Sequence, residues 1–147
     1  MNTPITMHFT IEELCASATA KAKGINNTPN MQQMVNLVYL AAYVLEPLRV
    51  AMNEPIKIGS GFRSAKLNDA VGGVKNSQHM KGQAVDLCID GDLKKGKKWF
   101  AYIRDHLPFD QLIWEHNNKG NYWVHVSFVY PDFGKNRKQV IDNLLKK

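Results

Sequence analysis

The first third of the chain shows the spacing of helices. Thr10 and Glu13 have the arrangement of a capping box, which predicts a helix that starts at Ile11 and ends before Gly24. From residue 30 onward, apolar residues recur at alternating steps of three and four, as on the buried stripe of one long helix. Pro47 is expected to kink this helix near its end, because proline has no backbone N–H to donate. The members of the stripe are Met31, Met34, Val38, Ala41, Leu45, Leu48 and Met52.

The second half of the chain alternates apolar and polar residues over short stretches, which is the pattern of strands. Residues 56–58 predict a short strand before a glycine-rich turn, and residues 84–89 predict another. Residues 111–115 and 123–128 predict a hairpin, because the segment Asn117-Asn118-Lys119-Gly120 between them is typical of a turn.

Two further helices fall between these strands. Residues 65–71 predict a brief helix closed by glycines, and Asp92 begins a helix with its apolar residues facing inward. Helices followed by mostly antiparallel strands, with one intervening helix, indicate an α+β fold. A chain of 147 residues with 44% hydrophobic content fits one domain, residues 1–147.

Charge narrows the range of partners. Nineteen Lys and Arg against thirteen Asp and Glu leave a net charge of +6, which favours anionic partners. The lysines cluster at residues 94–98 and 135–147 without the interleaved aromatic residues of a single-strand binding surface. Nucleic acid is therefore not expected as a partner.

Cys15 and Cys88 are the only cysteines, which excludes a disulfide scaffold and predicts two buried free thiols. The N-terminal residues lack a basic start, an apolar core and a cleavage pattern. No run of about 18 apolar residues is present either. We therefore expect a protein made in the cytoplasm without a signal peptide and without membrane insertion.

One segment and one distant histidine together indicate a metal site. Residues Ser77 to Asp86 read S-x-H-x-x-G-x-A-x-D, and His125 stands between two valines. A catalytic zinc site uses three protein ligands and leaves the fourth position to water. His79 and Asp86 are too far apart for one helix face, but a loop histidine, a reversal at Gly82 and a strand aspartate can bring them together.

Strand periodicity supports the same site. Because side chains alternate along a strand, apolar residues on one face leave Asp86 and His125 on the other, where both can face one cleft. Taken singly, each of His79, Asp86 and His125 is more often an ordinary polar residue. Their combination makes a metal site the better interpretation. The apolar residues that set the faces are Val85, Leu87, Ile89, Val124, Val126 and Phe128.

These residues and several neighbouring motifs resemble the zinc D-Ala-D-Ala carboxypeptidase family, which includes D,D-dipeptidases, phage peptidoglycan endopeptidases and, by fold, the hedgehog domain. The resemblance runs from about Phe9 to Arg137, with the motifs in residues 56–137. The wording of these motifs is similar to that of the small phage and prophage branch of the family. It implies a hedgehog/DD-peptidase-like domain whose N-terminal helices pack on the sheet beside a zinc cleft. The motifs are Ser60-Gly61-Phe62-Arg63-Ser64, Leu67-Asn68, Val71-Gly72-Gly73, Phe109-Asp110-Gln111 and Trp123-Val124-His125-Val126-Ser127.

The resemblance also implies roles for individual residues. His79, Asp86 and His125 would hold one zinc ion per chain. Arg63 would bind the substrate or the developing oxyanion, which suits a guanidinium that can meet a carboxylate in bidentate fashion. A structural ion pair is the alternative role for Arg63. Ser77 would assist in substrate binding.

The general base departs from the family pattern, in which an acidic residue lies three positions before the last histidine. Tyr122 occupies that position here, so another carboxylate must serve. Glu115 is the first candidate, because Leu112 and Trp114 in the core would place Glu115 on the cleft face, next to the strand of His125.

Two other residues near that strand are alternatives. Asp110 stands at the start of the strand, in the alternation opposite to that of Glu115. Its side chain is therefore expected to hold a loop in place and not to act as the base. His116 could stabilise the transition state, although a solvated turn histidine is more common.

The expected activity is hydrolysis of a peptide bond in the stem peptide of bacterial peptidoglycan, by a monomer. Zinc would lower the pKa of its water to about 7, and Glu115 would take the water proton and pass it to the leaving amine. The bond could be that of a D-Ala-D-Ala carboxypeptidase, an L-Ala-D-Glu endopeptidase or a D,D-dipeptidase.

Two points about the biological role follow. The absence of a signal peptide fits a phage or prophage enzyme that acts on the cell wall after release or delivery. The alternative is a non-catalytic virion or envelope module that binds wall peptides, which the missing carboxylate at Tyr122 would favour.

Overall fold

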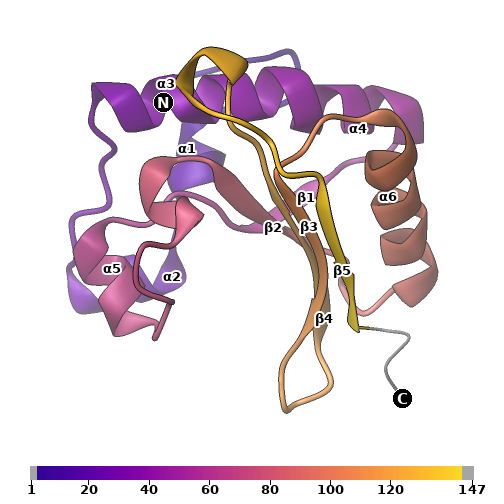
Figure 1. Cartoon of the computed structure of the whole chain (residues 1–147). Coiled ribbons are helices and arrows are strands. Elements are labelled where there is room, and N and C mark those ends of the chain that lie inside the picture. Colours follow the sequence, from indigo (N-terminus) through magenta and orange to yellow (C-terminus); the bar gives the residue numbers. More distant parts are fainter. Residues whose placement is uncertain (1–2, 144–147) are drawn as a thin grey trace.

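Five strands form one sheet in the order β1-β2-β4-β3-β5 (Figure 1). The structure is a computed structural model and describes residues 3–143. Neighbouring strands are antiparallel except β3 and β5, which run parallel. The strands are β1 (Lys57–Ser60), β2 (Ala84–Cys88), β3 (Gln111–His116), β4 (Tyr122–Ser127) and β5 (Gln139–Asp142).

The two faces of the sheet differ in chemistry. Alternate residues of β2, β3 and β4 are almost fully buried on one face, where they form part of the core. The residues between them, including Asp86 and His125, lie on the opposite face, as the alternation predicted. The predicted α+β architecture is confirmed. The core residues of these strands are Val85, Leu87, Leu112, Trp114, Val124 and Val126.

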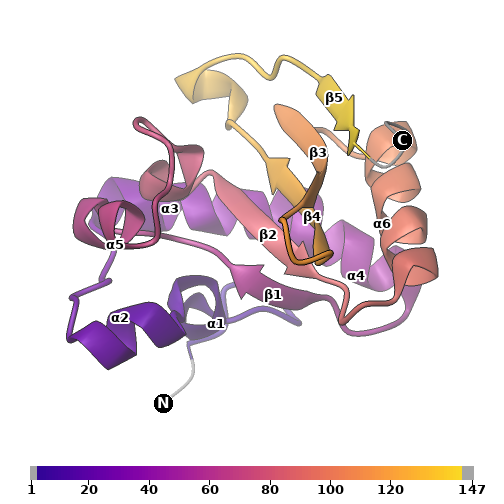
Figure 2. The same ribbon diagram turned by 90° about the horizontal axis from the view of Figure 1, so that it is seen from below.

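A long helical segment lies across the core face of the sheet, and α6 (Leu93–His106) packs beside it (Figures 1 and 2). The segment consists of α3 (Met31–Leu40), a π-helical stretch (Ala41–Leu45) and α4 (Glu46–Met52). The carboxylate of Asp92 accepts a hydrogen bond from the Lys95 N–H, so the predicted start of α6 is confirmed.

The buried stripe of the long helix is displaced from the predicted one. Met31 and Met34 are exposed, because the first turns of α3 lie against the polar segment that follows residue 77 and not against the core. The predicted Ala41, Leu45 and Leu48 are buried. The core residues that the prediction missed are Leu37, Leu40 and Val44.

Pro47 lies within the helical segment, and the backbone adjusts just before it. The N–H of Glu46 bonds to the carbonyl of Ala41, five residues back, as in a π-helix. Helix α4 continues beyond the proline to Met52, and the kink at Pro47 stays a prediction.

The predicted helix from Ile11 to Gly24 is wrong as one element, since it divides into α1 (Ile11–Cys15) and α2 (Ala18–Lys23). The capping box at Thr10 is present, as predicted. Ser17 then caps a second helix by accepting a hydrogen bond from the Ala20 N–H. The serine side chain hydrogen-bonds a backbone N–H in place of a helical carbonyl, which favours the end of the first helix and the start of the second.

The remaining elements connect these layers. They are α5 (Ala65–Ala70) and two 3₁₀ helices, η2 (Gln78–Lys81) and η3 (Pro131–Phe133). Strand β5 was not predicted from the sequence; it adds to the edge of β3. Cys15 and Cys88 are free, as predicted, but both are only partly buried. Burial raises the pKa of the Cys15 thiol to about 11.

Within residues 3–143, Met31–Met52 is the one helix whose length and composition would allow it to cross a membrane, with a mean hydropathy of 1.3. Several of its apolar residues are buried in the domain core, and this burial accounts for the apolar composition of the helix. The absence of membrane insertion stays a prediction.

Gly96 on α6 allows the helix to approach the sheet. A Cβ at Gly96 would lie 2.5 Å from the ring of Trp114 and 3.0 Å from Ile89, both buried. Overpacking costs about 1–3 kcal/mol, which exceeds the roughly 1 kcal/mol that alanine gains over glycine in helix propensity. We therefore expect Gly96→Ala to lower the free energy of unfolding in urea. The exposed Lys97→Ala is the control, and equal stability of the two variants would contradict this packing.

Candidate metal centre

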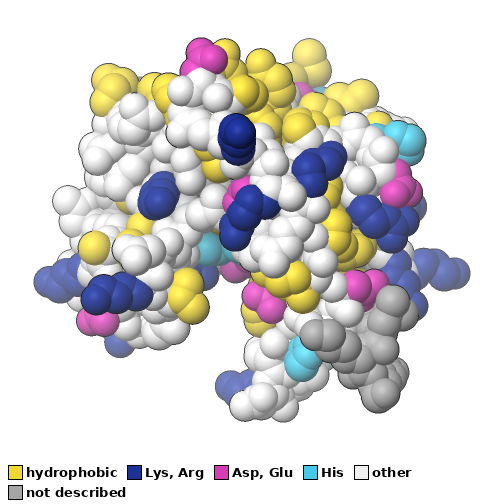
Figure 3. Space-filling view, viewed as in Figure 1, with side chains coloured by type: hydrophobic (Ala, Val, Ile, Leu, Met, Phe, Trp, Pro, Cys, Tyr) yellow, Lys and Arg dark blue, Asp and Glu magenta, His cyan; other side chains and the backbone are white. Residues whose placement is uncertain are grey.

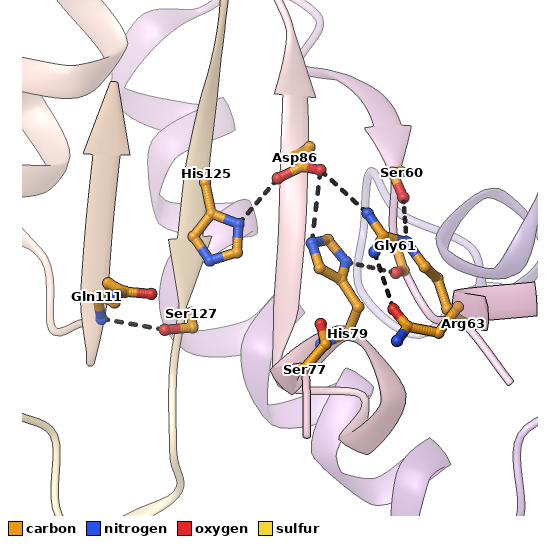
Figure 4. A network of polar contacts seen from close by, with 10 residues as sticks. Ser60, Gly61, Arg63, Ser77, His79, Asp86, Gln111, His125 and Ser127 are labelled. Carbon is orange, nitrogen blue, oxygen red and sulfur yellow. Dashed lines mark hydrogen bonds and ion pairs between the residues drawn. The ribbon is translucent and has the colours of Figure 1, made fainter. Parts of the chain in front are cut away.

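His79, Asp86 and His125 converge on the polar face of the sheet (Figure 4). Asp86 on β2 is the direct cross-strand partner of His125 on β4. Asp86 Oδ1 lies 2.9 Å from His125 Nδ1, and Asp86 Oδ2 lies 3.4 Å from His79 Nε2. One potential ligand atom from each side chain lies within 4.8 Å of the other two, and no second group of this kind is found among residues 3–143.

His79 is carried by η2, where the sequence had predicted a loop. Ser77 is buried and caps η2, since its Oγ accepts a hydrogen bond from the His79 N–H at 3.2 Å. Gly82 ends η2 with a φ of +73°, the reversal that the sequence predicted. Helix α3 holds this turn from the other side, because the Gln33 and Asn36 amides donate to carbonyls of η2.

The ring of His79 has a defined orientation. Its Nδ1 lies 2.8 Å from the carbonyl oxygen of Gly61, so Nδ1 carries the proton and donates. Nε2, on the other side of the ring, faces Asp86. A Cβ at Gly61 would lie 2.1 Å from the carbonyl oxygen of Leu14, so the close approach of this segment to α1 requires glycine.

Asn27 ties the N-terminal helices to the same segment. Its Nδ2 donates to the carbonyls of Cys15 and Phe62, at 2.8 and 3.0 Å. Its Oδ1 accepts from the Ser64 N–H at 2.7 Å. The backbone that orients His79 is therefore braced by α1 and by the turn after α2.

The electrostatics of the three side chains suit a cation. Burial alone would raise the pKa of the Asp86 carboxyl, but hydrogen bonds with His125 and His79 hold that pKa well below its usual range. Asp86 is therefore ionised at neutral pH. Two imidazole nitrogens and one carboxylate are a donor set that fits a zinc ion.

Arg63 lies beside this cluster on the segment that follows β1. Its Nη2 is 3.6 Å from Asp86 Oδ2, and its backbone N–H donates to the carbonyl of His79 at 3.1 Å. Nε donates to Ser60 Oγ at 3.3 Å and Nη1 donates to Asn68 Oδ1 at 3.1 Å. The guanidinium is thus held at the edge of the cluster.

The cluster forms part of the wall of a cavity of about 510 Å³. Figure 3 shows this side of the molecule hollowed between the α2 and α5 region and the β3–β4 hairpin. Arg63 and Ser77 line the cavity, as does Glu115. The side chains of Ile113 and Trp123 add apolar surface.

Glu115 lies where the strand alternation placed it. Ile113 is the cross-strand partner of His125, and Glu115 is two residues farther along the same face of β3. A diagonal pair of this kind is roughly 7–8 Å apart.

Tyr122 occupies the position three residues before the last histidine. Three residues is an odd number, so Tyr122 lies on the face of β4 opposite to His125. Its ring packs on the core, 5.9 Å from that of Trp114. A carboxylate at position 122 would face the core and not the cluster.

The alternative residues have other surroundings. Asp110 is buried away from the cavity lining, and its carboxylate accepts hydrogen bonds from the backbone and guanidinium of Arg137. Burial would raise the pKa of Asp110, but Arg137 holds it below its usual value. Asp110 thus fixes a loop, the role that its parity favoured. His116 is exposed at the end of β3 and does not line the cavity.

Three contacts of the site were not predicted from the sequence. They are the Gly61 carbonyl on His79, the brace made by Asn27, and the bond of Asn68 to Arg63. Gly61 and Asn68 stand in motifs that the family resemblance had marked, but those motifs did not indicate what either residue does. Asn27 stands in a turn sequence and gave no signal.

Comparisons with known proteins agree with this geometry. The family model described as peptidase M15 matches residues 7–127. The chain is 38% identical over 88 residues to a zinc D-Ala-D-Ala carboxypeptidase of Streptomyces albus G. The matched region covers 58% of this chain and 32% of that protein, so the chain aligns with about a third of its relative.

Proposed function

Because this chain belongs to the peptidase M15 family, we propose that it is a zinc-dependent peptidase that hydrolyses a peptide bond of bacterial peptidoglycan. The observation that carries the proposal is the convergence of His79, Asp86 and His125 on the wall of one cavity. The similarity to a zinc D-Ala-D-Ala carboxypeptidase supports both the metal and the class of substrate.

His79, Asp86 and His125 would hold the zinc ion. A bound zinc ion supplies a Lewis acid that polarises the scissile carbonyl and lowers the pKa of a water molecule to about 7. The Gly61 carbonyl keeps the proton of His79 on Nδ1, which leaves Nε2 free to bind the metal. Among these residues, only Asp86 offers an anionic ligand.

Glu115 acts as the general base in this proposal. It lines the same cavity and lies on the same face of the sheet as His125. Its carboxylate takes the proton of the attacking water as the bond to the carbonyl carbon forms. It then returns the proton to the leaving amine, so that Glu115 is ionised again at the end of the cycle.

Arg63 stabilises negative charge on the substrate. Its guanidinium lies beside the cluster, so it can bind a substrate carboxylate or the oxygen on which charge develops. The bond that is cut would be of the D-Ala-D-Ala carboxypeptidase or the L-Ala-D-Glu endopeptidase type. We place the enzyme in phage or prophage lysis or in wall remodelling, acting as a monomer at the cell wall after release or delivery.

We do not retain a non-catalytic wall-binding module as a second candidate. Its support was the missing carboxylate at Tyr122, and that position faces the core in this chain. Glu115 supplies a carboxylate on the cavity wall instead.

Digestion of purified sacculi with the zinc-loaded protein tests the proposal. Released muropeptides are analysed by mass spectrometry, with a chelator-treated sample as the control. We expect products whose new termini identify one bond type, and loss of these products with chelator that zinc restores. A muropeptide composition that is the same with and without the zinc-loaded protein would refute peptidoglycan hydrolysis.

A further inference from the structure

We propose that Asn68 is a positioning residue that holds the guanidinium of Arg63 at the metal cluster, and that Gly73 provides the space for this contact. The inference rests on the proposed function, since Arg63 there binds negative charge on the substrate. No role for Asn68 or Gly73 follows from the metal chemistry itself, because neither is a metal ligand.

Both ends of the Asn68 amide are used. Asn68 lies on α5 and is only 4% exposed. Its Oδ1 accepts from Arg63 Nη1 at 3.1 Å, and its Nδ2 donates to the carbonyl of Val74 at 3.0 Å. Its own backbone carbonyl accepts from the Gly73 N–H at 2.8 Å. The Val74 carbonyl, which lies at the rim of the cavity, thus orients the Asn68 amide, and the amide in turn orients the Arg63 guanidinium.

Gly73 lies against this contact. A Cβ at Gly73 would be 2.1 Å from Asn68 Oδ1 and 2.8 Å from Arg63 Nη1. Both atoms would have to move, and they are the two partners of the hydrogen bond. The backbone at Gly73 therefore packs directly on the amide–guanidinium pair, and glycine is required for that reason.

An amide suits this position better than a carboxylate. A neutral acceptor holds Arg63 without adding a second negative charge to that of Asp86, so the guanidinium keeps more of its attraction for an anionic substrate group. An aspartate at 68 would pair with Arg63 and would also place a negative oxygen against the Val74 carbonyl. Asn68 therefore positions Arg63 without adding a negative charge beside it.

The pre-organisation has an expected kinetic effect. An arginine side chain has many rotamers, and an unrestrained Arg63 would lose this conformational entropy when it meets the substrate. Misplacement of such a group by about 1 Å can cost on the order of 100-fold. Asn68→Ala should accordingly lower kcat/KM on soluble muropeptides by about 10- to 100-fold, with zinc content unchanged.

A double-mutant comparison identifies Arg63 as the group through which Asn68 acts. In an Arg63→Ala background, Asn68→Ala should cause little further loss of kcat/KM, because the guanidinium is already absent. Asp69→Ala, an exposed neighbour on α5, serves as the matched control and should retain wild-type kinetics. Equal fold-losses from Asn68→Ala in the two backgrounds would overturn the proposal.

A second measurement does not depend on activity. The side-chain N–H signals of Arg63 in ¹⁵N NMR spectra are assigned by their loss in Arg63→Lys. We expect them to move toward the positions of a free arginine in Asn68→Ala, and in Gly73→Ala should Asn68→Ala fail to fold. In Asn68→Asp they should stay dispersed while kcat/KM falls, since the acceptor remains but the charge is cancelled.

Unchanged Arg63 signals in folded Asn68→Ala or Gly73→Ala would overturn the positioning role. Should the wild-type chain leave sacculi and muropeptides intact, the proposed function fails, and the NMR signals alone then decide whether Asn68 positions Arg63. The failures of the two proposals are therefore distinguishable.

Discussion

Replacing His125 with alanine is expected to reduce bound zinc from about one ion per chain to a small fraction and to lower hydrolysis of sacculi by roughly 10³-fold or more. The variant retains only His79 and Asp86, and two ligands hold zinc poorly beside competing water. Metal analysis of the purified protein by atomic emission, together with sacculus digestion, measures both effects.

The fold should survive this substitution. His125 lies on the cavity face of β4, so its removal leaves the core residues on the other face in place. His116→Ala is the matched control, because His116 is an exposed histidine at the end of the neighbouring strand. It should bind zinc like the wild-type protein. Undiminished zinc stoichiometry in folded His125→Ala would show that the proposed ligand set is wrong.

The placement of Asp86 and His125 on one face could be predicted from the sequence, because strand periodicity leaves little choice. Side chains alternate with a period of two, so a shift of one residue would exchange the core and the cavity faces. Val85 and Val124, both fully buried, fix the choice in β2 and β4. The same reasoning placed Glu115 on the cavity wall.

The orientation of His79 could not be predicted in this way. It depends on Gly61 and on Gln33, which lie 18 and 46 residues from His79 in the sequence and have no local pattern that links them to it. Strand β5 was missed for a similar reason. It pairs with β3 across more than twenty residues, and none of its four residues is fully buried, so it lacks the apolar alternation of a half-buried strand.

The shift of the buried stripe in the long helix has a related cause. Periodicity indicates that a helix has an apolar face, but not which turns of the helix reach the core. Met31 and Met34 continue the apolar spacing beyond the end of the core contact, where α3 meets η2 through the amides of Gln33 and Asn36. The prediction therefore failed at the first turns of α3, and it also missed Leu37, Leu40 and Val44 in the middle of the segment, where the core covers a wider face than one stripe.

Glu115→Gln is expected to retain zinc and the fold but to lower the rate of hydrolysis by about 10²–10⁴-fold, the contribution of a general base. Glutamine has nearly the same shape as glutamate, so the cavity wall is preserved while the proton acceptor is removed. Sacculus digestion at matched zinc occupancy measures the loss. The contrast with His125→Ala is informative, because that variant should lose metal and activity together.

Asp110→Asn tests whether Asp110, the carboxylate just before β3, could be the general base in place of Glu115. Asp110 accepts hydrogen bonds from Arg137 and is buried, so the substitution should lower the free energy of unfolding by about 1–3 kcal/mol. The folded, zinc-loaded variant should hydrolyse sacculi at the wild-type rate, because Asp110 does not line the cavity. Wild-type turnover by Glu115→Gln would refute the base assignment, and loss of turnover in folded Asp110→Asn would transfer the role to Asp110. Glu115 on β3 and Asp110 just before β3 are only five residues apart, yet their substitution is expected to have opposite effects on turnover and stability.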